Sequence, residues 1–179
     1  MNSLAKAETA GSAPADRGQR QYLTFMLGRE VYAIGILAIK EIIEYGQLTV
    51  VPMMPPFLRG VINLRGAVVP VVDLSARFGK GPTEVTRRSC IVILEMETED
   101  GTQVVGVAVD AVNEVLEIAA EDIEPPPAFG AHINADFIAG MGKVEGRFVI
   151  LLDVNRVLGS EDLAQVSRAG AVAEAEMAH

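Results

Sequence analysis

Short apolar runs alternate with glycine-containing turns along this chain, a pattern that predicts β-strands joined by hairpins. Apolar residues over 22–27 and 31–34 flank a turn at 28–30 and predict the first hairpin. Residues 36–43 fit a helix or a strand by periodicity alone, and their β-branched side chains favour a strand. The alternation resumes over 89–96, where a further hairpin is predicted to open a second half of the chain.

Part of this pattern occurs twice. The segment 57–79 recurs 80 residues later, and the segment 28–44 recurs 73 residues later, so the second copy carries seven extra residues around 125–134. Duplication of this kind predicts two similar lobes in tandem. The recurring pairs are Phe57/Phe137, Gly60/Gly140, Gly66/Gly146, Val69/Val149, Asp73/Asp153 and Gly79/Gly159, and, upstream, Gly28/Gly101, Val31/Val104, Ala38/Ala111, Glu41/Glu114 and Glu44/Glu117.

Each copy also carries the signals of one short helix. Asp73 follows an apolar run and Gly79 ends the next segment, and Asp153 and Gly159 repeat this arrangement. Both aspartates are therefore predicted to be helix N-caps rather than catalytic acids. About five short strands per copy are apolar on both faces, and closure into a small barrel would hide their edges. The sequence predicts a mainly β protein made of two five-stranded barrel lobes with short helices.

The domain organisation follows from the same pattern. Residues 1–20 are rich in Ala, Gly, Ser and charge and are predicted to be a disordered tail. One ordered domain is predicted over 21–163, with a first lobe over about 21–86 and a second over about 87–159, not strictly segregated. A C-terminal helix is predicted to begin at Ser160, followed by a tail over 164–179.

Composition narrows the classes of partner. The chain has 179 residues, of which 50% are hydrophobic, and this length allows roughly 70% of the unfolded surface to be buried. A net charge of −9 argues against nucleic acid or an anionic membrane surface as the direct partner. The single cysteine fits a reducing cytosol. The start lacks the apolar core of a signal peptide, and the apolar runs are too short to span a membrane.

The sequence shows no arrangement typical of catalysis or cofactor binding. The two histidines, His132 and His179, lack further metal ligands at suitable spacing. Cys90 heads an apolar strand and is read as a small buried hydrophobe. The glycine-rich segments lack the spacing of a phosphate loop. We therefore expect no enzyme activity and no cofactor or metal. A barrel that binds a small molecule and regulates a partner remains an alternative.

The hairpin turns of the two copies differ in charge. Arg65 stands at the first turn inside an apolar run, and Glu145 stands at the second. Arginine in such a run is rarely found unpaired, and Glu41 on a strand of the same lobe is the expected partner. A buried Arg65–Glu41 pair would fix how neighbouring strands sit, so removing either partner would destabilise the lobe strongly. Exposure of the Arg65 head at the turn is the alternative.

A proline run marks the extra segment of the second copy. Pro125, Pro126 and Pro127 lead into Phe129, which has no counterpart in the first copy. Prolines hold a loop stiff and extended, so the loop can present an aromatic ring to a partner at low entropic cost. Phe129 is therefore the candidate interface residue of this loop.

These motifs closely resemble the CheW family of bacterial chemotaxis coupling proteins over about 21–163. The block at 60–66, Gly-Val-Ile-Asn-Leu-Arg-Gly, followed by Pro-Val-Val-Asp-Leu at 70–74, is quite specific to this group. It is shared with the regulatory domain of the chemotaxis histidine kinase CheA and with CheV. No kinase or receiver sequence is present here, which favours the stand-alone coupling protein. The other matching residues are Phe25, Leu27, Gly28, Tyr32, Ala33, Ile34, Glu41, Ile42, Pro52 and Pro55.

The resemblance implies two SH3-like five-stranded barrels and a non-catalytic adaptor that couples chemoreceptors, the methyl-accepting chemotaxis proteins, to CheA. It implies that Ile39, Gly60 and Cys90 face the receptor tip and that the loop ending at Phe129 faces the regulatory domain of CheA. It also implies a cytoplasmic protein that associates peripherally with membrane receptor arrays. A CheW-like scaffold of a non-flagellar chemosensory pathway is the alternative within this family.

Overall fold

The computed structural model describes residues 19–98, 101–125 and 135–159. Phe129, the segment from Ser160 onward and the remainder of both predicted tails lie outside the described residues. The first strand begins at Gln19, two residues earlier than predicted, because Gln19 and Arg20 pair with Ala119 and Ile118 of a distant strand.

Most of the described chain is β-structure, as the alternation predicted. The strands are β1 (Gln19–Leu27), β2 (Glu30–Gly35), β3 (Ile39–Glu44), β4 (Leu58–Leu64), β5 (Ala67–Asp73), β6 (Cys90–Thr98), β7 (Gly101–Val109), β8 (Ala111–Ala119), β9 (Ile123–Glu124), β10 (Ile138–Val144) and β11 (Arg147–Leu152). The short helices are η1 (Ile36–Ala38), α2 (Leu74–Arg77), η2 (Ala120–Asp122), η3 (Ala135–Phe137) and α3 (Val154–Val157). The ambiguous segment 36–43 is thus a single 3-10 turn followed by a strand.

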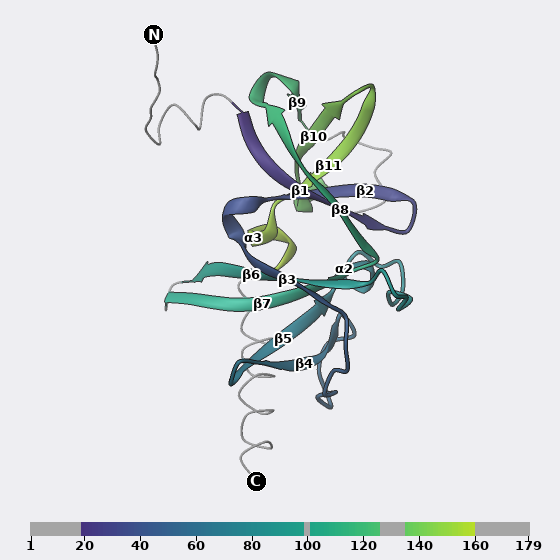
Figure 1. The fold of residues 1–179 in the computed structure, drawn as a ribbon, viewed down its shortest axis with the longest axis vertical. Coiled ribbons are helices and arrows are strands. Elements are labelled where there is room, and N and C mark those ends of the chain that lie inside the picture. Colours follow the sequence, from purple (N-terminus) through teal and green to yellow (C-terminus); the bar gives the residue numbers. More distant parts are fainter. Residues whose placement is uncertain (1–18, 99–100, 126–134, 160–179) are drawn as a thin grey trace.

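The strands form two sheets that lie one above the other in Figure 1, with α3 between them. The five-stranded sheet has the order β3-β6-β7-β5-β4, and the six-stranded sheet has the order β8-β1-β2-β11-β10-β9. The fold is mainly β with two SH3-like lobes, as predicted, but one sheet has six strands rather than five because the two-residue strand β9 pairs with the edge of β10.

The two copies of the repeat exchange their first hairpins between the sheets. Hairpin β1–β2 belongs to the first copy but pairs with β8 and β11 of the second, as in the contact of Tyr22 with Leu116. Hairpin β6–β7 belongs to the second copy but pairs with β3 and β5 of the first, as in the contact of Ile42 with Val92. The division near residue 86 therefore separates the repeats of the sequence, whereas each sheet takes strands from both sides of it.

Equivalent hairpin turns close both lobes in the same backbone geometry. Arg65 and Gly66 have φ angles of 51° and 89°, and Glu145 and Gly146 have φ angles of 49° and 80°. Two consecutive positive φ angles in a two-residue loop are typical of the type I′ turn, whose twist matches that of the flanking strands. Glycine at the second position of each turn adopts this conformation without steric cost.

Four apolar clusters fill the fold, and the smallest consists of Val51 and Val61. The largest lies between the sheets and includes the fully buried side chains of Phe25, Tyr32, Leu74, Val92 and Leu94. Each sheet also carries a smaller cluster, on the face that points away from the other sheet. In the five-stranded sheet its members are Val69, Val71, Ile91, Ile93 and Ala108, and in the six-stranded sheet Ala33, Ile118, Val149 and Leu151. Such side chains fill the interiors of both small barrels, as expected for five or six strands.

Candidate partner-binding surfaces

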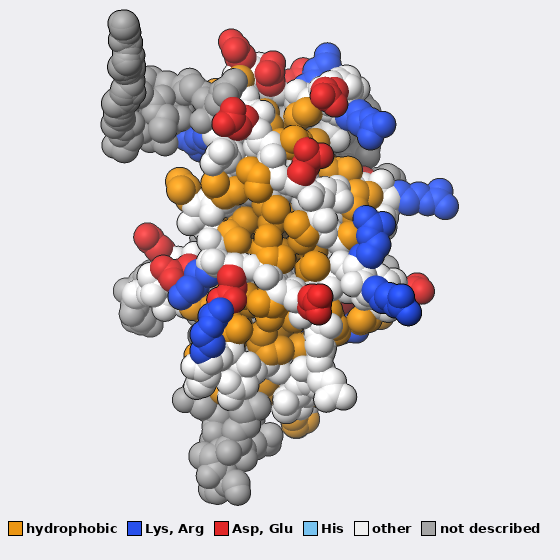
Figure 2. Space-filling model, viewed as in Figure 1, with side chains coloured by type: hydrophobic (Ala, Val, Ile, Leu, Met, Phe, Trp, Pro, Cys, Tyr) orange, Lys and Arg blue, Asp and Glu red, His pale blue; other side chains and the backbone are white. Residues whose placement is uncertain are grey.

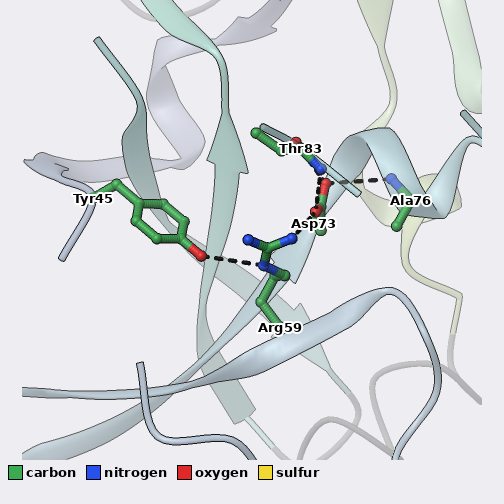
Figure 3. A network of polar contacts seen from close by, with 5 residues as sticks. All are labelled: Tyr45, Arg59, Asp73, Ala76 and Thr83. Atoms are coloured by element: carbon green, nitrogen blue, oxygen red, sulfur yellow. Dashed lines mark hydrogen bonds and ion pairs between the residues drawn. The ribbon is translucent and has the colours of Figure 1, made fainter. Parts of the chain in front are cut away.

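The two N-cap aspartates lie in different surroundings. The Asp73 carboxylate is fully buried and accepts hydrogen bonds from the Ala76 amide at 3.3 Å and from the Thr83 hydroxyl and amide at 2.7 Å each. The Arg59 guanidinium donates a further hydrogen bond at 3.2 Å, and its Nε donates to the Tyr45 hydroxyl (Figure 3). Every lone pair of this carboxylate faces a donor, so the arrangement is that of a structural anchor.

Asp153 has a simpler role at the equivalent position. Its carboxylate accepts from the Asn155 amide at 3.1 Å, and Arg156 lies 3.6 Å away in an exposed ion pair. The Asp153 side chain is 35% exposed, and Ala139 stands where the first copy has Arg59. The sequence predicted the same capping role for both aspartates. Comparing Arg59 with Ala139 would have indicated the difference, whereas Thr83 carries no signal in the sequence.

Arg65 and Glu41 form a bidentate ion pair with nitrogen–oxygen distances of 2.6 and 2.8 Å. Glu41 lies on β3, and Arg65 lies on the turn that follows β4. The strands β3 and β4 are the two outer strands of the five-stranded sheet. The pair therefore bridges the open seam of this lobe. The second copy has Glu114 and Glu145 at the equivalent positions, so only the first copy can make this link.

The pair is not buried, which corrects the expectation of a buried ion pair. The Arg65 side chain is 73% exposed, because it stands at the tip of a hairpin. The hydrogen bond from Arg65 is the main cause that lowers the pKa of Glu41, and the same bond raises the pKa of Arg65. Water screens such a pair, so we expect a much smaller loss of stability on its removal than for a buried pair.

The residues predicted to face a receptor are spread over one sheet. Ile39 lies opposite Leu94 and Cys90 opposite Glu44, so these two residues mark opposite ends of the β3–β6 ladder. Gly60 lies on β4 at the other edge of the same sheet. Ile39 and Cys90 are partly buried and pack against the core cluster between the sheets. Ile39 and Cys90 thus border the region between the two sheets.

Gly60 itself has a structural reason to be glycine. Its φ angle is 154°, and an added Cβ would lie 2.5 Å from the backbone oxygen of Thr49. Thr49 pairs with Val61 across this gap, with hydrogen bonds of 2.8 and 2.9 Å. Any side chain at Gly60 would therefore push apart the backbone that closes the five-stranded lobe.

Cys90 shows no sign of an activated thiol. It is partly buried, and this burial is the main cause that raises the pKa of its thiol, with Glu44 acting in the same direction. A raised pKa keeps the thiolate fraction low near neutral pH, and the thiolate is the reactive form. Cys90 thus contributes shape and apolar surface at this position.

An apolar groove opens beside η1. It encloses about 660 Å³ and is lined by apolar side chains of β1, β2, η1, β11 and α3, namely Tyr22, Ile34, Ile36, Leu37, Leu152 and Val154. Leu37 is 98% exposed at its rim, and the charged residues Arg20, Glu117 and Asp153 also line the groove. Leu37 was not among the residues predicted from the sequence. Its counterpart in the second copy is Asp110, and that polar equivalent could have indicated an exposed position.

The groove adjoins a wider apolar surface. Figure 2 shows hydrophobic side chains gathered over α3, β3 and the neighbouring parts of β1 and β8, with charged side chains around the margin. Contiguous apolar patches rimmed by polar residues are typical of protein-binding surfaces.

Among the residues that the structure describes, no group of three or more His, Cys, Asp or Glu side chains is placed so that it could hold a metal ion. Within the same ranges, no helix is long and apolar enough to cross a membrane.

Comparison with known proteins identifies the fold. The family model of the CheW-like domain matches residues 21–162. The chain is 34% identical to the chemotaxis protein CheW of Klebsiella aerogenes, over 91% of this chain and 96% of that protein. It is 36% identical to CheW of Rhizobium meliloti, over 81% of this chain and 91% of that protein.

Two further comparisons bear on structure and pathway. The crystal structure of the scaffolding protein TtCheW from Thermoanaerobacter tengcongensis superposes with a TM-score of 0.71 and 33% identity, covering 80% of this chain and 90% of that one. Protein FrzA of Myxococcus xanthus is 29% identical, over 88% of this chain and 92% of that protein. The match over most of both lobes confirms the resemblance seen in the motifs, and the chain belongs to the CheW-like family of chemotaxis adaptor proteins.

Proposed function

We propose that this adaptor uses separate surfaces to bind the cytoplasmic tip of a chemoreceptor and the regulatory domain of the histidine kinase CheA. In this proposal Ile39, Gly60 and Cys90 belong to the receptor side, and the loop that ends at Phe129 belongs to the kinase side. A scaffold must hold both partners at once, and a single shared patch would make binding exclusive. The protein acts without catalysis, in the cytoplasm, at the periphery of membrane receptor arrays.

The observation that carries this proposal is the apolar surface between the sheets. A groove of about 660 Å³ with Leu37 98% exposed at its rim offers an anchor for a protein partner. Central apolar anchors supply most of the binding energy in protein interfaces, whereas rim charges mainly set the association rate. The barrel interiors are filled by Val, Ile and Leu side chains, which speaks against a small ligand inside either barrel.

Titration of single variants against each purified partner tests the proposal. Ile39→Asp should weaken receptor binding, Phe129→Ala should weaken kinase binding, and Leu37→Asp should weaken one partner only. A hot-spot side chain contributes roughly 2 kcal/mol, so we expect a loss of about thirtyfold. Val85→Asp is the matched control, because Val85 is exposed on a loop away from the groove. Parallel loss of both partners in every folded variant would contradict separate surfaces.

A scaffold role in a non-flagellar chemosensory pathway is the second candidate. The similarity to FrzA, a relative that does not carry the CheW name, is compatible with it. Capture of partners from a lysate of the source cells, with identification by mass spectrometry, distinguishes the pathways by which receptor and which kinase are recovered.

A further inference from the structure

The connection from β5 to β6 begins between the two sheets, where Leu74 and Phe78 join the core cluster, and it is anchored to the five-stranded sheet. Asp73 at the end of β5 binds Thr83 by two hydrogen bonds of 2.7 Å, which ties both ends of the segment 73–83 together. Arg59 on β4 holds the same carboxylate from the neighbouring strand. The segment is therefore a fixed part of the lobe that contains β4 and β5.

Arg77, at the end of α2, projects from this segment to the point where the two repeats meet. Its guanidinium carbon lies 5.2 Å from the ring centroid of Phe57 and 4.8 Å from that of Phe137. Its Nε donates a 2.9 Å hydrogen bond to the carbonyl of Val157. Phe57 and Phe137 are equivalent residues of the two copies, and so are Arg77 and Val157. One cation thus joins two repeat-related rings that belong to different lobes.

Phe78 and Lys80, which follow Arg77 in the chain, also contact residues of the six-stranded sheet. The ring of Phe78 lies 5.7 Å from that of Tyr32 on β2 and 5.8 Å from that of Phe137. Lys80 donates from Nζ to Glu30 at 2.5 Å and to the Tyr32 hydroxyl at 2.8 Å. Both β2 residues belong to the six-stranded sheet. Three side chains within four positions therefore connect the anchored segment to the opposite sheet.

The second copy lacks an equivalent set of charges. Val157 and Leu158 occupy the positions of Arg77 and Phe78, and both are buried apolar residues. At these two positions the second copy offers no charged side chain, so the cations in these contacts of the described residues come from the first copy. Apolar contact in the core is non-directional, whereas a ring-sandwiched guanidinium and a two-acceptor ammonium have preferred geometries. These contacts can select one orientation among those that the core alone would allow.

We propose that Arg77, Phe78 and Lys80 form an inter-sheet clamp that fixes the angle between the two lobes and so the relative placement of the partner surfaces. Arg77 and Lys80 are positioning residues, since neither lines the apolar groove beside η1. The placement of the partner surfaces rests on the proposed function, whereas the angle between the lobes does not.

Double electron–electron resonance in the full chain measures distances between spin labels, and the distance between labels on the two sheets depends on the angle between the lobes. Nitroxides at Glu97 on β6 and Lys143 on β10, both exposed, report the distance between sheets, in a Cys90→Ala background. Labels at Glu97 and Asn63 report a distance within the five-stranded sheet and serve as the internal control.

The variant pair Arg77→Met and Lys80→Met removes charge and donors while keeping side-chain length. In the double variant the distribution of the inter-sheet distance should shift or broaden, and the distribution within the sheet should stay as in the parent. Arg87→Met, on an exposed arginine of the following loop, should change neither. An unchanged inter-sheet distribution in the folded double variant overturns the clamp.

If the double variant does not fold, Lys80→Met and Arg77→Lys are measured singly. Lysine keeps the charge but cannot stack as a planar group, so Arg77→Lys should still broaden the inter-sheet distance. Parent-like distributions in both single variants overturn the clamp as well.

A second readout uses the partners with Cys90 intact. The double variant should bind receptor tip or kinase domain alone as the parent does, but should lose roughly tenfold in affinity for the second partner once the first is bound. Unaltered assembly of both partners despite an altered distance would overturn the functional part of the clamp. Failure of the parent to bind either partner would instead refute the proposed function and leave the distance measurement valid.

Discussion

The buried carboxylate of Asp73 gives the sharpest prediction, because the second copy supplies its own control. Asp73 and Asp153 cap equivalent helices, but Asp73 is fully buried with four donors and Asp153 is 35% exposed. Loss of a helix cap alone costs about 1 kcal/mol. We therefore expect Asp153→Ala to lower the free energy of unfolding by about 1 kcal/mol, and Asp153→Asn to be nearly neutral, since the amide oxygen still accepts from the Asn155 amide.

Asp73→Ala should lower the free energy of unfolding considerably more than the loss of a helix cap alone would. It leaves the Thr83 amide and hydroxyl and the Arg59 guanidinium without their acceptor, and each unsatisfied group adds about 1–3 kcal/mol. Arg59 keeps partial access to water, being 26% exposed, which discounts its share. The sum comes to about 3–5 kcal/mol, the range that applies when one partner of a buried pair is removed.

Asp73→Asn separates the charge from the cap. Its amide oxygen can still accept from Ala76 and the Thr83 hydroxyl, but its NH₂ group would face the Thr83 amide and Arg59, which are both donors. Asparagine should therefore restore little of the loss, contrary to what a simple cap would predict. Urea unfolding followed by circular dichroism measures all four variants. Asp73→Asn within about 0.5 kcal/mol of the parent would refute this reasoning.

Three further predictions concern residues of the five-stranded sheet and its β4–β5 turn. Arg65→Ala should raise the pKa of Glu41 toward its ordinary value, measured by NMR titration; because the folded pKa of Glu41 is depressed, the pair stabilises at neutral pH and its contribution disappears in acid as Glu41 protonates. An unmoved Glu41 titration would contradict the pairing. Cys90 should react with iodoacetamide more slowly than a free thiol at pH 7.5, and a faster reaction would show an activated thiolate. Gly60→Ala should destabilise by roughly 2 kcal/mol or more, whereas Gly46→Ala, with open space around it, should not; equal melting temperatures would rule out the close contact with the backbone.

Local features of the fold could be predicted from the sequence because they depend on neighbours in the chain. Turn residues such as Arg65-Gly66 and the capping Asp73 determine hairpins and short helices through a few adjacent backbone groups. The duplication also predicted two similar lobes correctly. Segment 36–43 stayed ambiguous because its apolar spacing suits a helical turn and a strand, and the structure contains both.

Features that depend on distant partners could not be predicted in this way. Nothing in the alternation of 22–35 indicates that this hairpin joins the strands of the other copy, since any apolar strand face would serve. The Arg65–Glu41 pair was found because an arginine in an apolar run demands a partner, but its exposure depends on where the turn lies in the folded sheet. The Asp73 network needed Thr83, which reaches the carboxylate from a loop without regular structure.

The exchange of hairpins between the repeats has a consequence for synthesis on the ribosome. Hairpin β1–β2 emerges first, but the strands that flank it in the sheet, β8 and β11, are made only at 111–119 and 147–152. Its apolar residues must wait for about 80 further residues before the first of these partners exists, which takes roughly 4–16 s at the usual speed of translation. The five-stranded sheet, in contrast, is complete once Val109 has been made. The six-stranded sheet therefore receives its β1–β2 hairpin before the five-stranded sheet is complete, but it is itself completed last. The β1–β2 hairpin is the part of the nascent chain whose apolar residues most need protection.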